Sequence, residues 1–105
     1  MKIQINTDKN ILGHEAHADS DETILEQALA RFSDQITRIE VHLSDENSAA
    51  KSGMADKRCL LEVRLAGRQP ASVSEQAQTV DQAVRGAAQK MVSSLESEMG
   101  KLGKH

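Results

Sequence analysis

One long amphipathic helix is predicted by residues 79–105, TVDQAVRGAAQKMVSSLESEMGKLGKH, and it completes the element order on which the fold depends. Thr79 and Gln82 have capping-box spacing, so Thr79 can accept a bond from the third helical amide while Gln82 reaches back. Gly86 costs a helix interior up to ~1 kcal/mol, and we therefore expect a close approach to the other helix there, with a functional reason as the alternative. The apolar stripe consists of Val80, Val84, Ala87, Ala88, Met91, Leu95, Met99 and Leu102.

Four segments before this helix are predicted to be strands. Residues 2–6, 38–43 and 58–65 alternate between apolar and polar side chains, which is typical of half-buried strands. Residues 70–76 follow a turn at 66–69 and start with proline, which an edge strand tolerates. The expected inward side chains are Ile3, Ile5, Ile39, Val41, Leu43, Cys59, Leu61, Val63 and Leu65.

A shorter helix is predicted between the first two strands. Ser20 is expected to cap it, and Asp21 and Glu22 would lie in its first turn, where the helix dipole favours acids. Ile36 is expected to close the turn after it, and residues 44–57 form a polar connection. The apolar stripe of this helix consists of Ile24, Leu25, Ala28, Leu29 and Phe32.

The β-α-β-β-β-α order predicts a single α+β domain over residues 1–105. We expect a four-stranded mixed sheet, with a parallel first crossover and an antiparallel meander of the last three strands. Each helix has one apolar stripe and each strand one apolar side, so both helices must cover the same face. The other face would carry Gln4, Asn6, Arg38, Glu40, His42, Leu60, Glu62, Arg64, Ser72 and Ser74.

Composition excludes several classes of protein. The chain has no apolar run long enough for a signal peptide or a membrane span, so a cytoplasmic location is expected. The single cysteine, Cys59, excludes an internal disulfide and is expected to be a small buried hydrophobe. Phe32 is the one aromatic residue, which excludes base reading on aromatic platforms.

The sequence predicts no enzyme, cofactor or metal site. His14 and His17 are three residues apart in a predicted loop, whereas a zincin helix needs histidines four apart. A glycine-rich phosphate loop is absent, and Ser72 and Ser74 have no partner that would make either a nucleophile. His42 is expected to be a surface histidine, with a contact at an interface as the alternative.

Charge is distributed unevenly along this chain of net charge −3. Residues 1–56 hold five basic and eleven acidic side chains, whereas basic residues dominate 57–70 and slightly outnumber acids in 79–105. Any nucleic-acid binding would therefore use phosphates and shape, through the C-terminal half. Ordinary solvated charges are the alternative. The candidate RNA-binding residues are Lys57, Arg58, Arg64, Arg68, Arg85, Lys90, Lys101 and Lys104.

The chain resembles a known family over nearly its whole length. The resemblance is carried by the element order, by VHLSDEN at 41–47 followed by DKRC at 56–59, and by DQAVRGAAQKM at 81–91. The family is that of the ribosome hibernation-promoting factors, also called ribosome-associated inhibitor A or sigma-54 modulation proteins. This chain is similar to the short form, which lacks the C-terminal dimerisation domain.

The resemblance implies a double-stranded-RNA-binding-domain-like fold and a translation inhibitor that occupies the mRNA and tRNA channel of the small ribosomal subunit. Lys90 matches a basic position of the family's second helix, and Lys101 and Lys104 fall in its basic tail. Asp81 stands where an aromatic residue is common, and the chain is acidic overall. The alternative is a diverged module that acts through protein contacts, or as a weak homodimer using Leu60 or the strand after Pro70.

Overall fold

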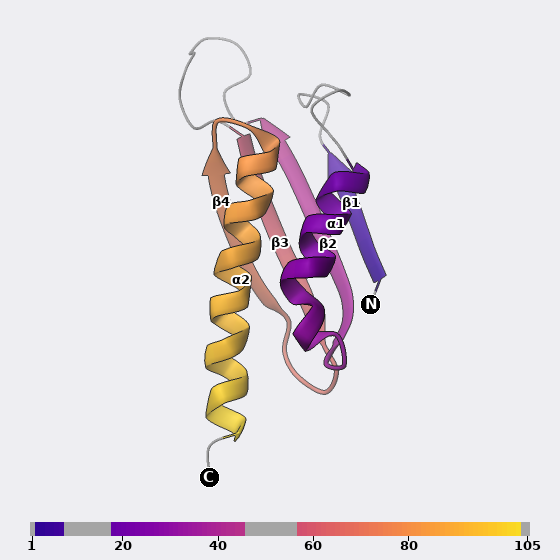
Figure 1. Ribbon diagram of the computed structural model, residues 1–105, viewed down its shortest axis with the longest axis vertical. Helices are drawn as coiled ribbons and strands as arrows, with labels where there is room; N and C mark the ends of the chain where they lie inside the picture. The colour runs from indigo at the N-terminus through magenta and orange to yellow at the C-terminus, as the bar shows by residue number, and fades with distance from the viewer. Residues whose placement is uncertain (1, 8–17, 46–56, 104–105) are drawn as a thin grey trace.

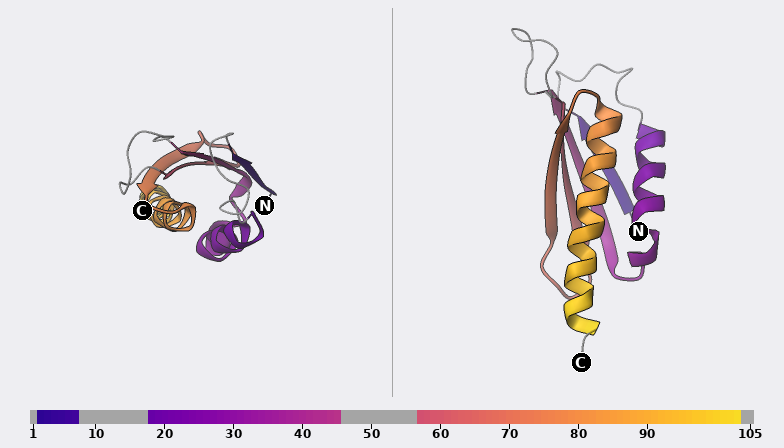
Figure 2. Two further views of the ribbon diagram at one scale, coloured as in Figure 1. Left: turned by 90° about the horizontal axis from the view of Figure 1, so that it is seen from above. Right: turned by 60° about the vertical axis from the view of Figure 1, so that its left-hand side comes forward.

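The computed structural model describes residues 2–7, 18–45 and 57–103, with side chains for 2–7, 20–45 and 57–98. A four-stranded sheet carries two helices on one face (Figures 1 and 2), which confirms the predicted α+β architecture. Most of the two predicted connections, at 8–17 and 46–56, lies outside the described residues. The elements are β1 (Lys2–Thr7), α1 (Ala18–Leu29), the 3-10 helix η2 (Ala30–Phe32), β2 (Ile36–Asp45), β3 (Lys57–Leu65), β4 (Ala71–Ala77) and α2 (Val80–Gly103).

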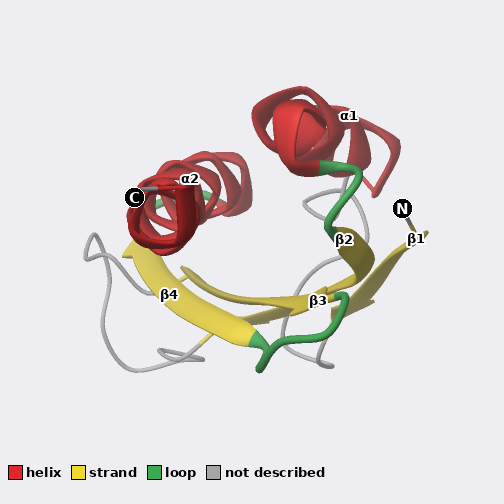
Figure 3. Ribbon diagram, turned by 90° about the horizontal axis from the view of Figure 1, so that it is seen from below, coloured by secondary structure: helices red, strands yellow, loops and turns green. Residues whose placement is uncertain are grey.

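The sheet has the strand order β1-β2-β3-β4. β1 and β2 are parallel, with Ile5 beside Val41, and β3 runs antiparallel to both β2 and β4. Both helices lie on the concave side of the curved sheet (Figure 3). The inward and outward sides of the strands are therefore those that alternation predicts.

The core lies between the sheet and the two helices. β2 and β3 supply its centre, because these strands have neighbours on both sides and helices above them. Burying one such aliphatic side chain contributes about 1.5–3 kcal/mol. The largest fully buried apolar side chains are Leu25, Leu29, Ile39, Val41, Leu43, Leu61, Val63, Val84, Met91 and Leu95.

The start of α1 differs from the prediction. The helix begins at Ala18, so Ser20 lies inside the first turn and is not the cap residue. Asp21 is 1% exposed, because it precedes Leu25 by four residues and shares its inward side of the helix. Cys59 is fully buried beneath it, and desolvation together with the charge of Asp21 raises the pKa of the thiol from 9.0 to about 12. Cys59 is therefore a protonated core side chain, as the sequence predicts.

The start of α2 confirms the predicted cap. The amide of Gln82 donates to Thr79 Oγ1 at 3.1 Å, and the amide of Ala83 donates to the Thr79 carbonyl at 3.0 Å. The buried stripe then runs from Val80 to Leu95. The side chains of Met99 and Leu102, which the sequence adds to this stripe, lie outside the described ones.

The expected helix contact at Gly86 is wrong. A Cβ at Gly86 would lie 2.7 Å from Cγ and Oε2 of Glu75 and 2.9 Å from its Cδ, and Glu75 belongs to β4. Glu75 stands on the helix-covered side of its strand, since it is in register with the buried Cys59. Glycine is thus needed because a carboxylate side chain, and not α1, passes under α2 at this point.

Several strand ends extend one or two residues beyond their predicted bounds. Ile36 is the first residue of β2 and is 4% exposed, so it belongs to the core. Its amide also donates to the Ser33 carbonyl at 3.4 Å, which closes the turn after η2 as the sequence predicts. At the other end, β2 continues to Asp45 and β3 begins at Lys57, where Lys57 Nζ lies 3.1 Å from Asp45 Oδ2. This pair extends the β2–β3 ladder up to the last described residues before the connection.

Candidate nucleic-acid interface

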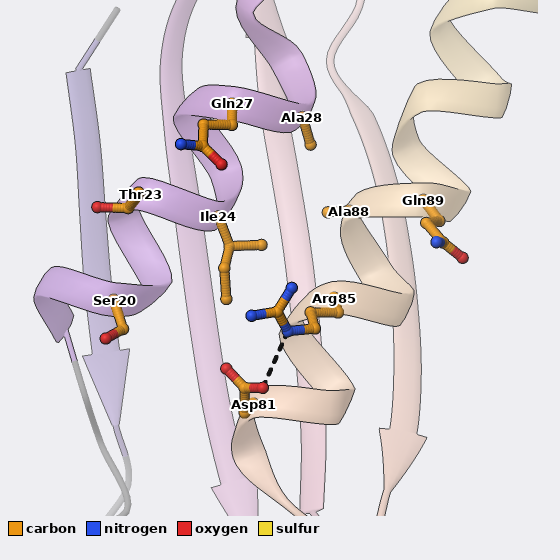
Figure 4. Close-up of a pocket in the computed structure, with 9 residues that line it drawn as sticks. All are labelled: Ser20, Thr23, Ile24, Gln27, Ala28, Asp81, Arg85, Ala88 and Gln89. Carbon is orange, nitrogen blue, oxygen red and sulfur yellow. Dashed lines mark hydrogen bonds and ion pairs between the residues drawn. The ribbon is translucent and has the colours of Figure 1, made fainter.

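A groove of about 700 Å³ runs between α1 and α2 (Figure 4). Small side chains, Ala28 on α1 and Ala88 on α2, form part of its floor, and hydroxyl, amide and charged groups line its walls. The hydroxyl, amide and charged groups of this open groove can hydrogen-bond a hydrated partner. The lining residues are Ser20, Thr23, Ile24, Gln27, Ala28, Asp81, Arg85, Ala88 and Gln89.

Both helices begin at the same end of this groove. Ser20 in the first turn of α1 and Asp81 in the first turn of α2 lie at that end (Figure 4). The positive ends of both helix dipoles therefore lie at that end of the groove, where they attract anions. Asp81 opposes this attraction in part, since its carboxylate stands in the same turn.

Arg85 reaches from α2 toward α1 across the groove (Figure 4). Its Nε lies 2.9 Å from Asp81 Oδ2, one helical turn earlier, and its side chain is 63% exposed. An exposed pair of this spacing contributes only ~0.3–0.5 kcal/mol. The guanidinium is therefore available to exchange Asp81 for a phosphate at small energetic cost.

Lys90 stands on a different side of α2 from Arg85. Five residues at 3.6 per turn place the two side chains roughly 140° apart around the helix. Lys90 Nζ lies 2.7 Å from Glu75 Oε1 and donates to the Ser74 carbonyl at 2.9 Å. Lys90 thus ties α2 to β4, and the structure does not bring it together with Arg85.

The other candidate residues are also dispersed. Lys57 faces the helix-covered side and is paired with Asp45, with 14% of its side chain exposed. Arg58 and Arg64 lie on the open side of β3, about 20 Å apart along the strand. Arg68 lies in the turn between β3 and β4, and the side chain of Lys101 and all of Lys104 are outside the described ones.

The pairing of the strands places two further basic residues, Lys2 and Arg38, beside the candidate Arg64. These two residues are not among the RNA-binding candidates that the sequence predicts. Lys2, Arg38 and Arg64 are aligned across β1, β2 and β3 on the open face of the sheet. Alternation predicts Arg38 on this face, but its alignment with Arg64 depends on how two separate strands pair. Alternation alone gives the face of a residue and not its neighbours across strands.

Another contact joins the two helices at the far end of α1. Arg31 in η2 forms an ion pair with Glu96 of α2, and its guanidinium carbon lies 5.0 Å above the ring centre of Phe32. Arg31 is therefore held between a carboxylate and an aromatic face.

Comparison with known proteins decides the family. The family described as Sigma 54 modulation protein / S30EA ribosomal protein matches residues 3–103. The chain belongs to this family. Membership in the Sigma 54 modulation / S30EA family confirms the resemblance seen in the sequence and places the chain among ribosome-associated proteins. A search of curated protein sequences found no match.

Solved structures that share the fold of this S30EA-family chain include the following two. The N-terminal domain of Thermus thermophilus Protein Y is 23% identical, with 92% of this chain and 98% of that one covered, at a TM-score of 0.70. A ribosomal subunit interface protein from Coxiella burnetii is 16% identical, with 95% and 99% covered, at a TM-score of 0.68. At such identities the likeness establishes the fold.

None of the described helices combines the length and apolarity that crossing a membrane requires.

Proposed function

We propose that this S30EA-family chain binds the small ribosomal subunit through rRNA phosphates and thereby holds it out of translation. The observation that carries the proposal is the groove between α1 and α2, with Arg85 across it and two helix N-termini at one end. Family membership and the resemblance to a ribosomal subunit interface protein support the choice of partner.

The groove reconciles RNA binding with an acidic chain. Binding phosphates requires local positive potential and hydrogen-bond donors, and the net charge of the whole protein matters less at close range. Arg85, the hydroxyls of Ser20 and Thr23 and the amide groups of Gln27 and Gln89 supply such donors. These groups recognise backbone and shape, which agrees with a chain whose one aromatic residue is buried.

Co-sedimentation with purified small subunits tests the proposal. If Arg85 and other basic side chains of the protein together neutralise about four phosphates, affinity falls on the order of 100-fold between about 50 and 200 mM salt. Arg85→Gln removes one charge-assisted contact and is expected to weaken binding about tenfold. Arg64→Gln makes the same charge change on the open sheet face and is expected to leave binding nearly unchanged.

The possible outcomes distinguish a wrong binding partner from a wrong binding surface. No binding of the unaltered protein even at low salt would reject the ribosomal partner. Binding that Arg64→Gln weakens and Arg85→Gln does not would move the contact from the groove to the open sheet face. Urea unfolding of both variants checks that each is folded.

The alternative of self-association gains little from the structure. Leu60 does lie on the open face, as expected, and is half-buried. Its register partners are His42 and Ser74, so in the described part of the sheet it is a single apolar side chain between polar ones. Isolated apolar side chains are normal on protein surfaces and do not indicate an interface.

A further inference from the structure

The open face of the sheet brings together three side chains that can ligate a metal ion. Glu40 and His42 are two residues apart on β2 and therefore share this face, and Glu62 on β3 is directly opposite Glu40. One ligand atom from each residue lies within 4.8 Å of the other two. All three side chains are half-buried, so they are accessible from solvent without being freely mobile.

We propose that Glu40, His42 and Glu62 form a binding site for a divalent transition-metal ion, with Zn²⁺ as the best fit. One imidazole nitrogen and two carboxylate oxygens are a donor set that zinc accepts, whereas Ca²⁺ and Mg²⁺ prefer oxygen alone. The proposal does not rest on ribosome binding, because this face is opposite to the one that the helices cover (Figure 3).

The distances are close to those that coordination requires. Tetrahedral zinc with ligands at about 2.0–2.2 Å separates its ligand atoms by about 3.4 Å. His42 Nε2 lies 3.7 Å from Glu40 Oε1. Glu40 and His42 are thus near coordination distance, whereas the ligand atom of Glu62, within 4.8 Å of theirs, moves closer by rotation of its side chain. Water from the open side can take the fourth position.

The two carboxylates also attract a cation at this point, although the ion pair between Arg38 and Glu40 balances part of their charge. Like charges directly opposite each other on neighbouring strands are destabilising, and Glu40 and Glu62 are such a pair. A divalent ion between the two carboxylates would attract both of them and offset their mutual repulsion. The sheet thus holds two carboxylates in register where repulsion would otherwise separate them.

A neighbouring arginine orients the first ligand. Arg38 Nε donates to Glu40 Oε2 at 2.8 Å, and Arg38 is itself hydrogen-bonded to Gln4 Oε1. Oε1 of Glu40 is then the oxygen that faces His42. Hydrogen bonds of this kind to a ligating carboxylate fix its orientation and are typical around metal sites.

Zinc titration by isothermal calorimetry tests the site, with chelator-treated protein that carries no affinity tag. The expected result is one zinc ion per chain. His42→Gln and Glu62→Gln each remove a ligand and are expected to weaken binding at least about tenfold, since even the loss of a group that only orients a ligand has an effect of this size. The matched control is His14→Gln with His17→Gln, which removes two histidines outside the proposed site and is expected to leave the affinity unchanged.

A second measurement does not depend on the variants. Zinc added to isotope-labelled unaltered protein is expected to shift the ring resonances of His42 and the backbone amides of Glu40 and Glu62. Shifts confined to His14, His17 or His105, or binding abolished in the control variant, would assign the ion to another site and overturn the proposal. Absence of binding at millimolar zinc would also overturn it.

Discussion

Replacing Gly86 by alanine tests how closely α2 passes over β4. Alanine is favoured over glycine in a helix interior by about 1 kcal/mol. Against this, the new Cβ would lie 2.7 Å from two atoms of Glu75, which must then move and lose its 2.7 Å contact with Lys90. Overpacking costs about 1–3 kcal/mol, so we expect Gly86→Ala to lower the free energy of unfolding by about 1 kcal/mol.

The test is a double-mutant cycle followed by urea unfolding and circular dichroism. In the background of Glu75→Ala the obstruction is gone, and Gly86→Ala is expected to raise the free energy of unfolding by about 1 kcal/mol. The coupling between the two positions is then about 2 kcal/mol, within the range for residues in contact.

Gly67→Ala is the matched control. Gly67 has a φ of 72°, and a methyl group on its Cα would meet nothing within 4 Å, so alanine there is disfavoured by backbone conformation alone. It should destabilise by about 1–2 kcal/mol and by the same amount whether residue 75 is glutamate or alanine. Stabilisation by Gly86→Ala with Glu75 present would refute the close packing, as would additivity of the two changes.

Three further predictions concern the cap, the α2–β4 contact and the buried thiol. Thr79→Ala removes the bond to the Gln82 amide and should lower the free energy of unfolding by about 1 kcal/mol, measured by thermal unfolding. Lys90→Met removes the donor to Glu75 and should destabilise by about 0.5–1.5 kcal/mol in urea; a change below about 0.3 kcal/mol would contradict this role. Because the pKa of Cys59 rises from 9.0 to about 12 on folding, stability should fall as pH rises above about 9, and Cys59→Ala should remove that part of the pH dependence.

The two proposed sites lie on opposite faces of the sheet and can be tested independently. The groove lies on the helix side and depends on Arg85, whereas the metal ligands lie on the open side. Zinc binding that leaves ribosome affinity unchanged is therefore compatible with both proposals.

Local sequence patterns were sufficient to predict the elements and the side on which each residue lies. The alternation of side chains in β2 and β3 has a period of 2 residues, and the apolar stripes of α1 and α2 have a period of 3.6 residues. Both patterns can be recognised within a few residues of sequence. Thr79 likewise predicts its own cap, because the capping bond is local. Element boundaries were predicted less well, since α1 begins at Ala18 and Ile36 lies in β2.

Contacts between distant segments could be read from the folded chain alone. The role of Gly86 depends on Glu75, which lies on another element, and the contact of Lys90 with Glu75 depends on how α2 is rotated over the sheet. Alternation places Glu40, His42 and Glu62 on the open face, but their convergence requires the register of β2 and β3. The physical reason is that periodicity fixes a direction for each side chain, whereas register and helix rotation are set by packing between distant segments.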